Sequence, residues 1–305
     1  MSTEPSQHYV DVPGGSVYYE VRGSGPLLLV IGQPMTCGPF GPLADLLAED
    51  HTVVTYDPHG VGESTVEDPS LAVTPEIEAD DLAQIIDDIG AERADVFGSS
   101  GGAVAGLAFA VRHPDKLGTL IAHEPPVPEV LPDAPYVRAA VDDIENAYRT
   151  DGPGAGFGKF VSVVMHQGPV TEAGVSPAAW PPPGSGNGEA ATEAGDGSDG
   201  GEAPRVPTEK EQADNELFLL HMLKPFLRYQ PPVGVLRCAG PRVVVAVGAA
   251  SGEEIAVRSA KALAEQLGTP PAVFPGDHGG FMADPEGFAT AIRRILASVD
   301  SALPT

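Results

Sequence analysis

Short apolar runs alternate along most of the chain with segments whose apolar positions recur at helical spacing. The apolar runs lie at Leu27–Ile31, Thr52–Tyr56, Ala94–Phe97, Thr119–Ala122, Arg242–Val247 and Ala272–Phe274. Two of them, Leu27–Ile31 and Thr52–Tyr56, are continuous, as expected of strands that are buried on both faces. The intervening segments predict the helices Leu43–Ala48, Glu76–Ile89, Gly101–His113, Ile255–Leu267 and Pro285–Ser298, and in Glu76–Ile89 the apolar residues form one core face. This alternation predicts an α/β fold with a mostly parallel, doubly wound sheet and helices on both faces.

Two features interrupt the alternation. At the N-terminal end, Tyr9–Val12 and Val17–Val21 flank a Pro-Gly-Gly turn, which predicts a hairpin at a sheet edge. In the middle, the pattern stops after Glu124 and resumes at Arg242, with helical segments predicted at Val137–Tyr148, Phe157–His166 and Glu209–Arg228. We therefore expect a core formed by residues 1–124 and 242–305, interrupted by a helical insertion at 125–241.

Within this insertion, residues 175–207 are rich in Pro, Gly, Ala and acidic residues and almost lack large apolar side chains. Such a segment cannot bury enough apolar area to offset the entropy of ordering it. We expect it to be flexible.

The net charge of the chain limits which binding partners it can have. The chain has 43 acidic and 17 basic residues, for a formal net charge of −26. This negative charge disfavours nucleic acids and anionic membranes as partners. The apolar runs are too short to cross a bilayer, and the first residues lack the basic and apolar regions of a signal peptide. We expect a soluble, cytoplasmic protein with a small-molecule substrate; the sequence does not determine its oligomeric state.

The glycine-rich stretch Gly98–Gly102 is the first candidate for chemistry. In the frame Gly98-x-Ser100-x-Gly102, the serine lies on a sharp turn between a predicted strand and a predicted helix, with its hydroxyl exposed. A serine hydroxyl needs a neighbouring base to become a nucleophile. His278 is the best-placed base, because it follows the last predicted strand in a loop that can bend toward a strand-end site. His123 is the competing histidine.

These motifs resemble those of the α/β-hydrolase fold superfamily, as does the turn Tyr56–Ser64. In that family the turn carries an arginine where this chain has His59. The resemblance implies that the insertion is a cap domain, which covers the pocket and sets substrate choice. It also implies an oxyanion hole formed by the main-chain N–H groups of Gly101 and Gln33.

The resemblance leaves the acid of the catalytic triad open. The family most often has an aspartate after the strand Arg242–Val247, where this chain has Ser251. Some members carry the acid one strand earlier, at the position of Glu124. We therefore expect Glu124 to orient His278, with Glu253 or Glu254, or no acid at all, as the alternatives.

Apolar residues beside these motifs are candidates for the pocket, namely Met35, Phe40 and Phe281, and Trp180 in the flexible segment could fold over a ligand. Neither Cys37 nor Cys238 belongs to a cluster with metal-ligand spacing, and no G-x-G-x-x-G fingerprint occurs. We expect no metal and no cofactor.

The leading hypothesis is a serine hydrolase that cleaves an ester, lactone or thioester of a small-to-medium apolar compound through an acyl-enzyme. The nucleophile Ser100 argues against dehalogenase and epoxide hydrolase chemistry, which in this fold needs a carboxylate nucleophile. Two alternatives keep the fold. One is a non-hydrolytic enzyme of a biosynthetic pathway, catalysing acyl transfer, perhydrolysis, C–C cleavage or cyclisation. The other is a binding protein that has lost catalysis.

Overall fold

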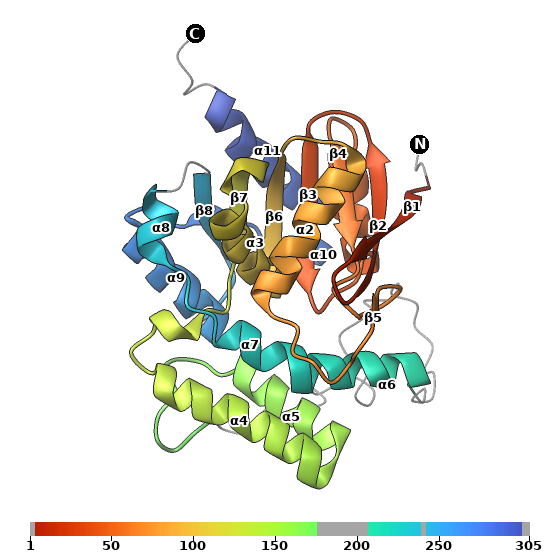
Figure 1. Cartoon of the computed structure of the whole chain (residues 1–305). Coiled ribbons are helices and arrows are strands. Elements are labelled where there is room, and N and C mark those ends of the chain that lie inside the picture. Colours follow the sequence, from red (N-terminus) through yellow and green to blue (C-terminus); the bar gives the residue numbers. More distant parts are fainter. Residues whose placement is uncertain (1–3, 176–206, 239–241, 301–305) are drawn as a thin grey trace, which may run out of the picture.

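One mixed sheet organises the chain (Figure 1). The computed structural model describes residues 4–175, 207–238 and 242–300. Eight of the strands follow the order β1-β2-β4-β3-β6-β7-β8-β9, and β5 pairs with β2. The strands are β1 (Ser6–Val12), β2 (Gly15–Gly23), β3 (Leu27–Gln33), β4 (Thr52–Tyr56), β5 (Thr65–Val66), β6 (Ala94–Ser100), β7 (Leu117–His123), β8 (Arg242–Gly248) and β9 (Ala272–Phe274).

Strand direction follows the predicted plan. Strands β1 and β2 form an antiparallel hairpin at one edge, and β2 is also antiparallel to β4. From β4 to β9 every neighbouring pair along the order is parallel. The mostly parallel sheet is confirmed, and its strand carboxyl ends meet along one edge, where ligand sites of such sheets form.

Both faces of the central part of the sheet are buried, and successive side chains of a strand point to opposite faces. In β3, Leu29 and Ile31 belong to one apolar cluster, whereas Leu28 and Val30 belong to a second cluster. The first cluster includes α2 (Pro75–Ile89), α3 (Gly101–Arg112) and α9 (Ile255–Leu267). The second includes α1 (Gly41–Leu47), α10 (Gly280–Ala283) and α11 (Pro285–Asp300). The two clusters explain why a central strand such as β3 has a continuous apolar run.

The interval between β7 and β8 is helical where it is described. It contains α4 (Ala134–Asp151), α5 (Pro153–Val164), α6 (Glu209–Glu216), α7 (Leu223–Leu227) and α8 (Val233–Cys238). In Figure 1, α4 to α7 lie together at one end of the sheet. The predicted helix Glu209–Arg228 is not one regular helix, because a π-helical section, Leu217–Met222, separates α6 from α7. Residues 176–206, which include most of the segment predicted to be flexible and Trp180, lie outside the described residues.

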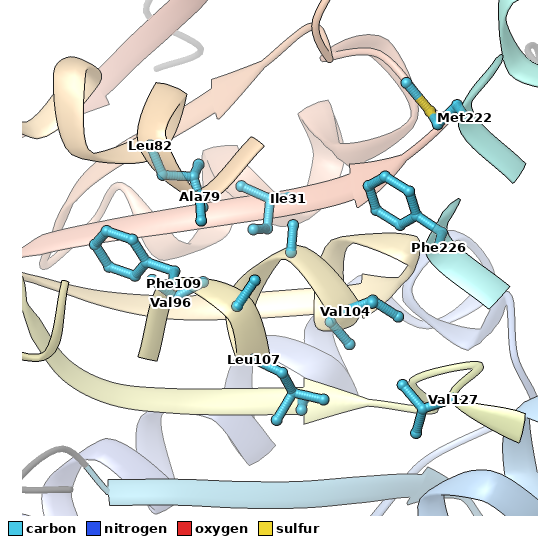
Figure 2. Close-up of a cluster of buried hydrophobic side chains, with 14 of the residues drawn as sticks. Ile31, Ala79, Leu82, Val96, Val104, Leu107, Phe109, Val127, Met222 and Phe226 are labelled. Atoms are coloured by element: carbon cyan, nitrogen blue, oxygen red, sulfur yellow. The ribbon is translucent and has the colours of Figure 1, made fainter. Parts of the chain in front are cut away.

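The inserted helices pack directly on the core. Met222 and Phe226 join the same apolar cluster as Ile31 of β3 and Val104 of α3, as Figure 2 shows. This packing fixes α7 over the carboxyl ends of the central strands. Among the described helices, none has the length and apolar composition needed to cross a membrane.

Candidate active site

Ser100 lies at the junction of β6 and α3 in a strained backbone conformation, with φ of 55° and ψ of −123°. Non-glycine residues rarely adopt such angles, which cluster at functional sites. The flanking glycines make the turn sterically feasible. A Cβ on Gly98 would lie 2.5 Å from the carbonyl oxygen of Gly102, and a Cβ on Gly102 would lie 2.4 Å from that of Ile31. The turn places Ser100 at the N-terminal end of α3, where the helix dipole favours negative charge.

His278 meets Glu124 at the same edge of the sheet. The imidazole Nδ1 of His278 lies 2.6 Å from Oε2 of Glu124, although the two residues are 154 positions apart. The His278 side chain is half exposed, whereas that of Glu124 is fully buried. His278, Glu124 and Ser100 all line one cavity. Sequence analysis expected these three residues at one site, and the structure brings them together there.

The carboxylate of Glu124 is held from its other side by β8 and the loop that follows. Its Oε1 accepts hydrogen bonds from the main-chain N–H of Gly248 (2.8 Å) and the hydroxyl of Ser251 (2.6 Å). Burial opposes the charge, but the hydrogen bonds from His278, Ser251 and Gly248 outweigh it and lower the pKa of Glu124 to about 2. Ser251, which occupies the position of the family's usual aspartate, thus supports the carboxylate that lies one strand away.

The alternative acids have other partners. Glu253 is exposed and its Oε1 pairs with Nζ of Lys261 at 2.8 Å. Oε1 of Glu254 accepts a hydrogen bond from Nε2 of Gln167 at 2.8 Å. The geometry therefore favours Glu124 over both as the partner of His278.

The competing histidine, His123, is fully buried beside the site. Its Nδ1 lies 3.3 Å from the hydroxyl of Ser99, and its Nε2 has no hydrogen-bond partner among the described residues. Burial lowers the pKa of His123 to about 4, so its ring is neutral near pH 7. The rings of Phe97, Phe274 and Phe288 surround it. His123 is thus a core residue in this structure.

Gln33 and Gly101, the expected oxyanion-hole residues, both lie next to Ser100. The β3–β6 register pairs Gln33 with Ser100. A Cβ on Gly101 would lie 2.8 Å from the carbonyl oxygen of Gln33, so the two backbones approach closely. Both residues line the cavity.

The cavity has a volume of about 420 Å³ and is walled mainly by apolar side chains of the inserted helices. These residues are Val137 of α4; Phe160, Val163 and Val164 of α5; Phe218 and Met222 of the π-helical section; and Leu223, Phe226 and Leu227 of α7. Phe160 and Phe218 pack edge to face, with ring centroids 5.1 Å apart. None of the described lining residues is a lysine or an arginine. The cavity therefore suits a neutral, apolar ligand.

The expected pocket residues next to the motifs require a correction. Phe40 and Phe281 stack on each other at 4.7 Å in the second core cluster, and Met35 packs against that cluster. None of the three lines the cavity. They follow the strand ends in sequence, but their side chains turn back between the sheet and α1, α10 and α11. The pocket instead takes its apolar walls from the inserted helices.

A buried polar cluster behind Gln33 was missed by sequence analysis. Glu78 and Asp81 lie on the core face of α2, three residues apart, and both are buried. Oε2 of Glu78 accepts hydrogen bonds from the hydroxyl of Tyr56 (2.5 Å) and Nε2 of Gln33 (3.0 Å). His59, which replaces the family's arginine, places Nδ1 2.8 Å from Oδ2 of Asp81. Two acidic residues at helical spacing among apolar core positions were the signal in the sequence.

Comparison with known proteins agrees with the fold. A family model described as alpha/beta hydrolase fold matches residues 25–186. Over 294 residues the chain is 28% identical to the uncharacterized hydrolase YraK of Bacillus subtilis (strain 168), and 94% of each chain is covered.

Two solved structures share the fold. A thermophilic esterase from Thermogutta terrifontis has a TM-score of 0.64 at 20% identity, covering 97% of this chain and 99% of that one. An enol-lactonase from Burkholderia xenovorans LB400 has a TM-score of 0.58 at 17% identity, covering 95% of this chain and 100% of that one.

Proposed function

Because this chain belongs to the α/β hydrolase fold family and is an α/β-hydrolase, we propose that it cleaves carboxylic esters, lactones or thioesters of small-to-medium apolar compounds through a serine acyl-enzyme. The observation that carries the proposal is the His278–Glu124 hydrogen bond of 2.6 Å at the cavity that Ser100 lines. A buried carboxylate on a histidine, next to a serine on a strained turn, is the arrangement that activates a serine nucleophile.

In this mechanism Glu124 fixes the tautomer of His278. The carboxylate accepts the Nδ1–H of the imidazole, which leaves Nε2 free to take the proton of Ser100. The serine oxygen attacks the carbonyl carbon, and His278 returns the proton to the leaving alcohol or thiol. Water then adds to the acyl-enzyme, with His278 again as the base, and releases the acid and the free serine.

Negative charge on the carbonyl oxygen is stabilised by main-chain donors. Gly101 is the first residue of α3, so its N–H is not used within the helix. Gln33, paired with Ser100 in the strand register, supplies the second N–H. The loss of one such donor typically costs about 3–4 kcal/mol of transition-state stabilisation.

The cavity supports a neutral acyl substrate. Its walls are aliphatic and aromatic, and the ionisable groups that line it, apart from His278, are the acidic side chains of Glu124, Glu254 and Asp277. A substrate carboxylate would therefore lose its hydration without gaining a cationic partner. We expect esters with a neutral apolar acyl chain to be cleaved in preference to esters of dicarboxylic acids.

The test combines an active-site probe with matched substrates. A fluorophosphonate should label the wild type and Ser99→Ala but not Ser100→Ala, because of these two serines Ser100 lines the cavity and Ser99 does not. p-Nitrophenyl hexanoate should be hydrolysed with a kcat/KM at least about 10-fold above that of p-nitrophenyl hemiadipate, which differs by a terminal carboxylate. Absence of labelling in the wild type would overturn the proposal. Labelling without release of the acid into water would support non-hydrolytic acyl chemistry instead.

A further inference from the structure

We propose that Glu78 is a positioning residue for the oxyanion hole: together with Tyr56 it holds the side chain of Gln33, and thereby keeps the main-chain N–H of Gln33 directed at the substrate carbonyl. This inference rests on the proposed function, in which Gln33 provides the second oxyanion donor.

The contacts of Glu78 converge on the ends of two neighbouring strands. Gln33 is the last residue of β3, and Tyr56 is the last residue of β4. Both donate hydrogen bonds to Oε2 of Glu78, at 3.0 and 2.5 Å. Oε1 accepts a third bond, from the main-chain N–H of His59 at 3.1 Å. One fully buried carboxylate thus ties the end of β3 to the end of β4 and to the turn beyond it.

The strand register explains why the end of β3 needs this tie. On one side, the pairing of β3 with β6 continues to the pair Gln33–Ser100. On the other side, the pairing of β3 with β4 ends at Leu29–Val54, four residues before Gln33. Near Gln33, β3 is therefore paired with β6 but no longer with β4. The Gln33 side chain supplies the restraint toward β4 through Glu78 and Tyr56.

Burying the ionised carboxylate of Glu78 costs free energy. A buried ionised group contributes little net stability, and apolar side chains of similar volume often serve packing better. Glu78 nevertheless accepts three hydrogen bonds at this position, one of them from a residue that lines the cavity. The need to place the oxyanion donor accurately explains why Glu78 is present. Misplacement of such a donor by about 1 Å can lower the rate about a hundredfold.

Protonation of Glu78 should weaken its hydrogen bonds to Gln33, Tyr56 and His59. Tyr56 from β4, His59 from the turn after β4 and Asp81 from α2 are the titratable groups that face it. Burial and the neighbouring Asp81 raise the pKa of Glu78 to about 7, against the hydrogen bonds from Tyr56 and Gln33. Above that pH the carboxylate accepts all three donors. Below that pH, one carboxyl oxygen of Glu78 carries a proton, so it becomes a hydrogen-bond donor and accepts fewer hydrogen bonds.

The experiment compares Glu78→Gln with Asp81→Asn. Asp81 lies on the same helix at similar burial, but it contacts His59 and not Gln33. At about pH 8.5, where Glu78 is ionised, we expect Glu78→Gln to lower kcat and the rate of fluorophosphonate labelling about 10-fold, with KM changed less than about twofold. Asp81→Asn should change kcat by less than about twofold. The pH profile of kcat should show one ionisation fewer in Glu78→Gln than in the wild type, because the variant lacks the ionisable carboxyl group of residue 78.

A double-mutant cycle with Gln33→Met separates positioning from a general loss of stability. The methionine removes the side-chain amide and keeps the main-chain N–H, so Glu78→Gln should have little further effect on kcat in that background. Tyr56→Phe, which leaves the Gln33–Glu78 bond in place, gives a milder variant if Glu78→Gln does not fold, and its kcat should also fall with KM unchanged.

Additive effects in the cycle would overturn the inference, as would an equal loss of kcat in Asp81→Asn or a change confined to KM. The proposed function fails separately, if wild-type Ser100 is not labelled and no ester is cleaved.

Discussion

Three donors reach the carboxylate of Glu124, one from the end of β8 and two from the loops that follow β8 and β9. The imidazole of His278 binds one oxygen, and Gly248 and Ser251 bind the other. The left-handed backbone of Glu124, with φ of 47°, and the hydrogen bond from its N–H to the carbonyl oxygen of Ala246 (2.9 Å) fix where the side chain starts. With its pKa near 2, the carboxylate remains ionised throughout the pH range in which a histidine titrates.

We predict that Glu124→Gln lowers kcat about a thousandfold or more, because an amide cannot balance the charge of the imidazolium and can stabilise the wrong tautomer. Adding Ser251→Asp should restore part of the loss, about 10-fold or more, since it introduces a carboxylate at residue 251, whose hydroxyl lies 2.6 Å from Oε1 of Glu124 in the wild type. Steady-state kinetics on a neutral ester measures both effects. Glu253→Gln, whose carboxylate pairs with Lys261, is the matched control. Full turnover by Glu124→Gln would show that another group orients His278.

At the scale of elements, α9 joins the insertion to the core. Arg258 of α9 forms a two-pronged ion pair with Asp133 at 2.5 and 3.0 Å and donates to the carbonyl oxygen of Gly168 at 2.9 Å. Asp133 also accepts from the N–H of Val170 at 2.7 Å. Asp133 immediately precedes α4, and Gly168 and Val170 follow α5, so one guanidinium fixes both ends of this helix pair. The walls of the cavity depend on that position.

Arg258→Met should lower the free energy of unfolding by about 3–5 kcal/mol, because it leaves the Asp133 carboxylate buried without its cation. Both side chains of the pair are about 10% exposed or less, so solvent screens the interaction weakly. Lys261→Gln on the same helix removes an exposed pair with Glu253 and should change stability by less than about 0.5 kcal/mol. Urea unfolding of the two variants makes the comparison. A loss below about 1 kcal/mol in Arg258→Met would mean that packing alone holds the helices.

Some elements were predictable and others were not. The parallel strands and α3 follow from local apolar patterns, and β9 coincides with its predicted range, Ala272–Phe274. The π-helical section Leu217–Met222 was not predictable, because the same apolar spacing suits a regular helix. Phe40 and Phe281 were misassigned to the pocket for a related reason. Sequence proximity to a motif does not reveal which side of the sheet a side chain packs against.

At the scale of the whole molecule, the dominant property is the formal net charge of −26 over 305 residues. A field of one sign changes the encounter rate of charged ligands over distances comparable to the Debye length, about 10 Å at 0.1 M salt. The apolar cavity and the negative surface thus act in the same direction, since both disfavour anionic substrates.

We predict that the kcat/KM of an anionic ester rises about two- to fivefold when ionic strength increases from about 0.01 to 0.3 M, because salt screens the repulsion. A neutral ester of the same length should show a change of less than about 1.5-fold over that range. Initial rates at low substrate concentration, with both esters assayed in one salt series, give the measurement. Equal salt dependence for the two esters would show that salt acts on the conformation of the protein and not on its electrostatic repulsion of the anionic ester.

The sequence by itself determined the mostly parallel sheet, the sharp turn around Ser100 and the histidine loop after the last strand, because each depends on local pattern and on glycine sterics. Glu124 was predicted to partner His278 with Glu253 and Glu254 as open alternatives, and only the tertiary structure distinguished their positions. That choice depends on the β7–β8 register and on hydrogen bonds between residues more than 120 positions apart. The cavity walls and the Glu78 cluster behind Gln33 were likewise decided by packing between distant segments, which no local pattern specifies.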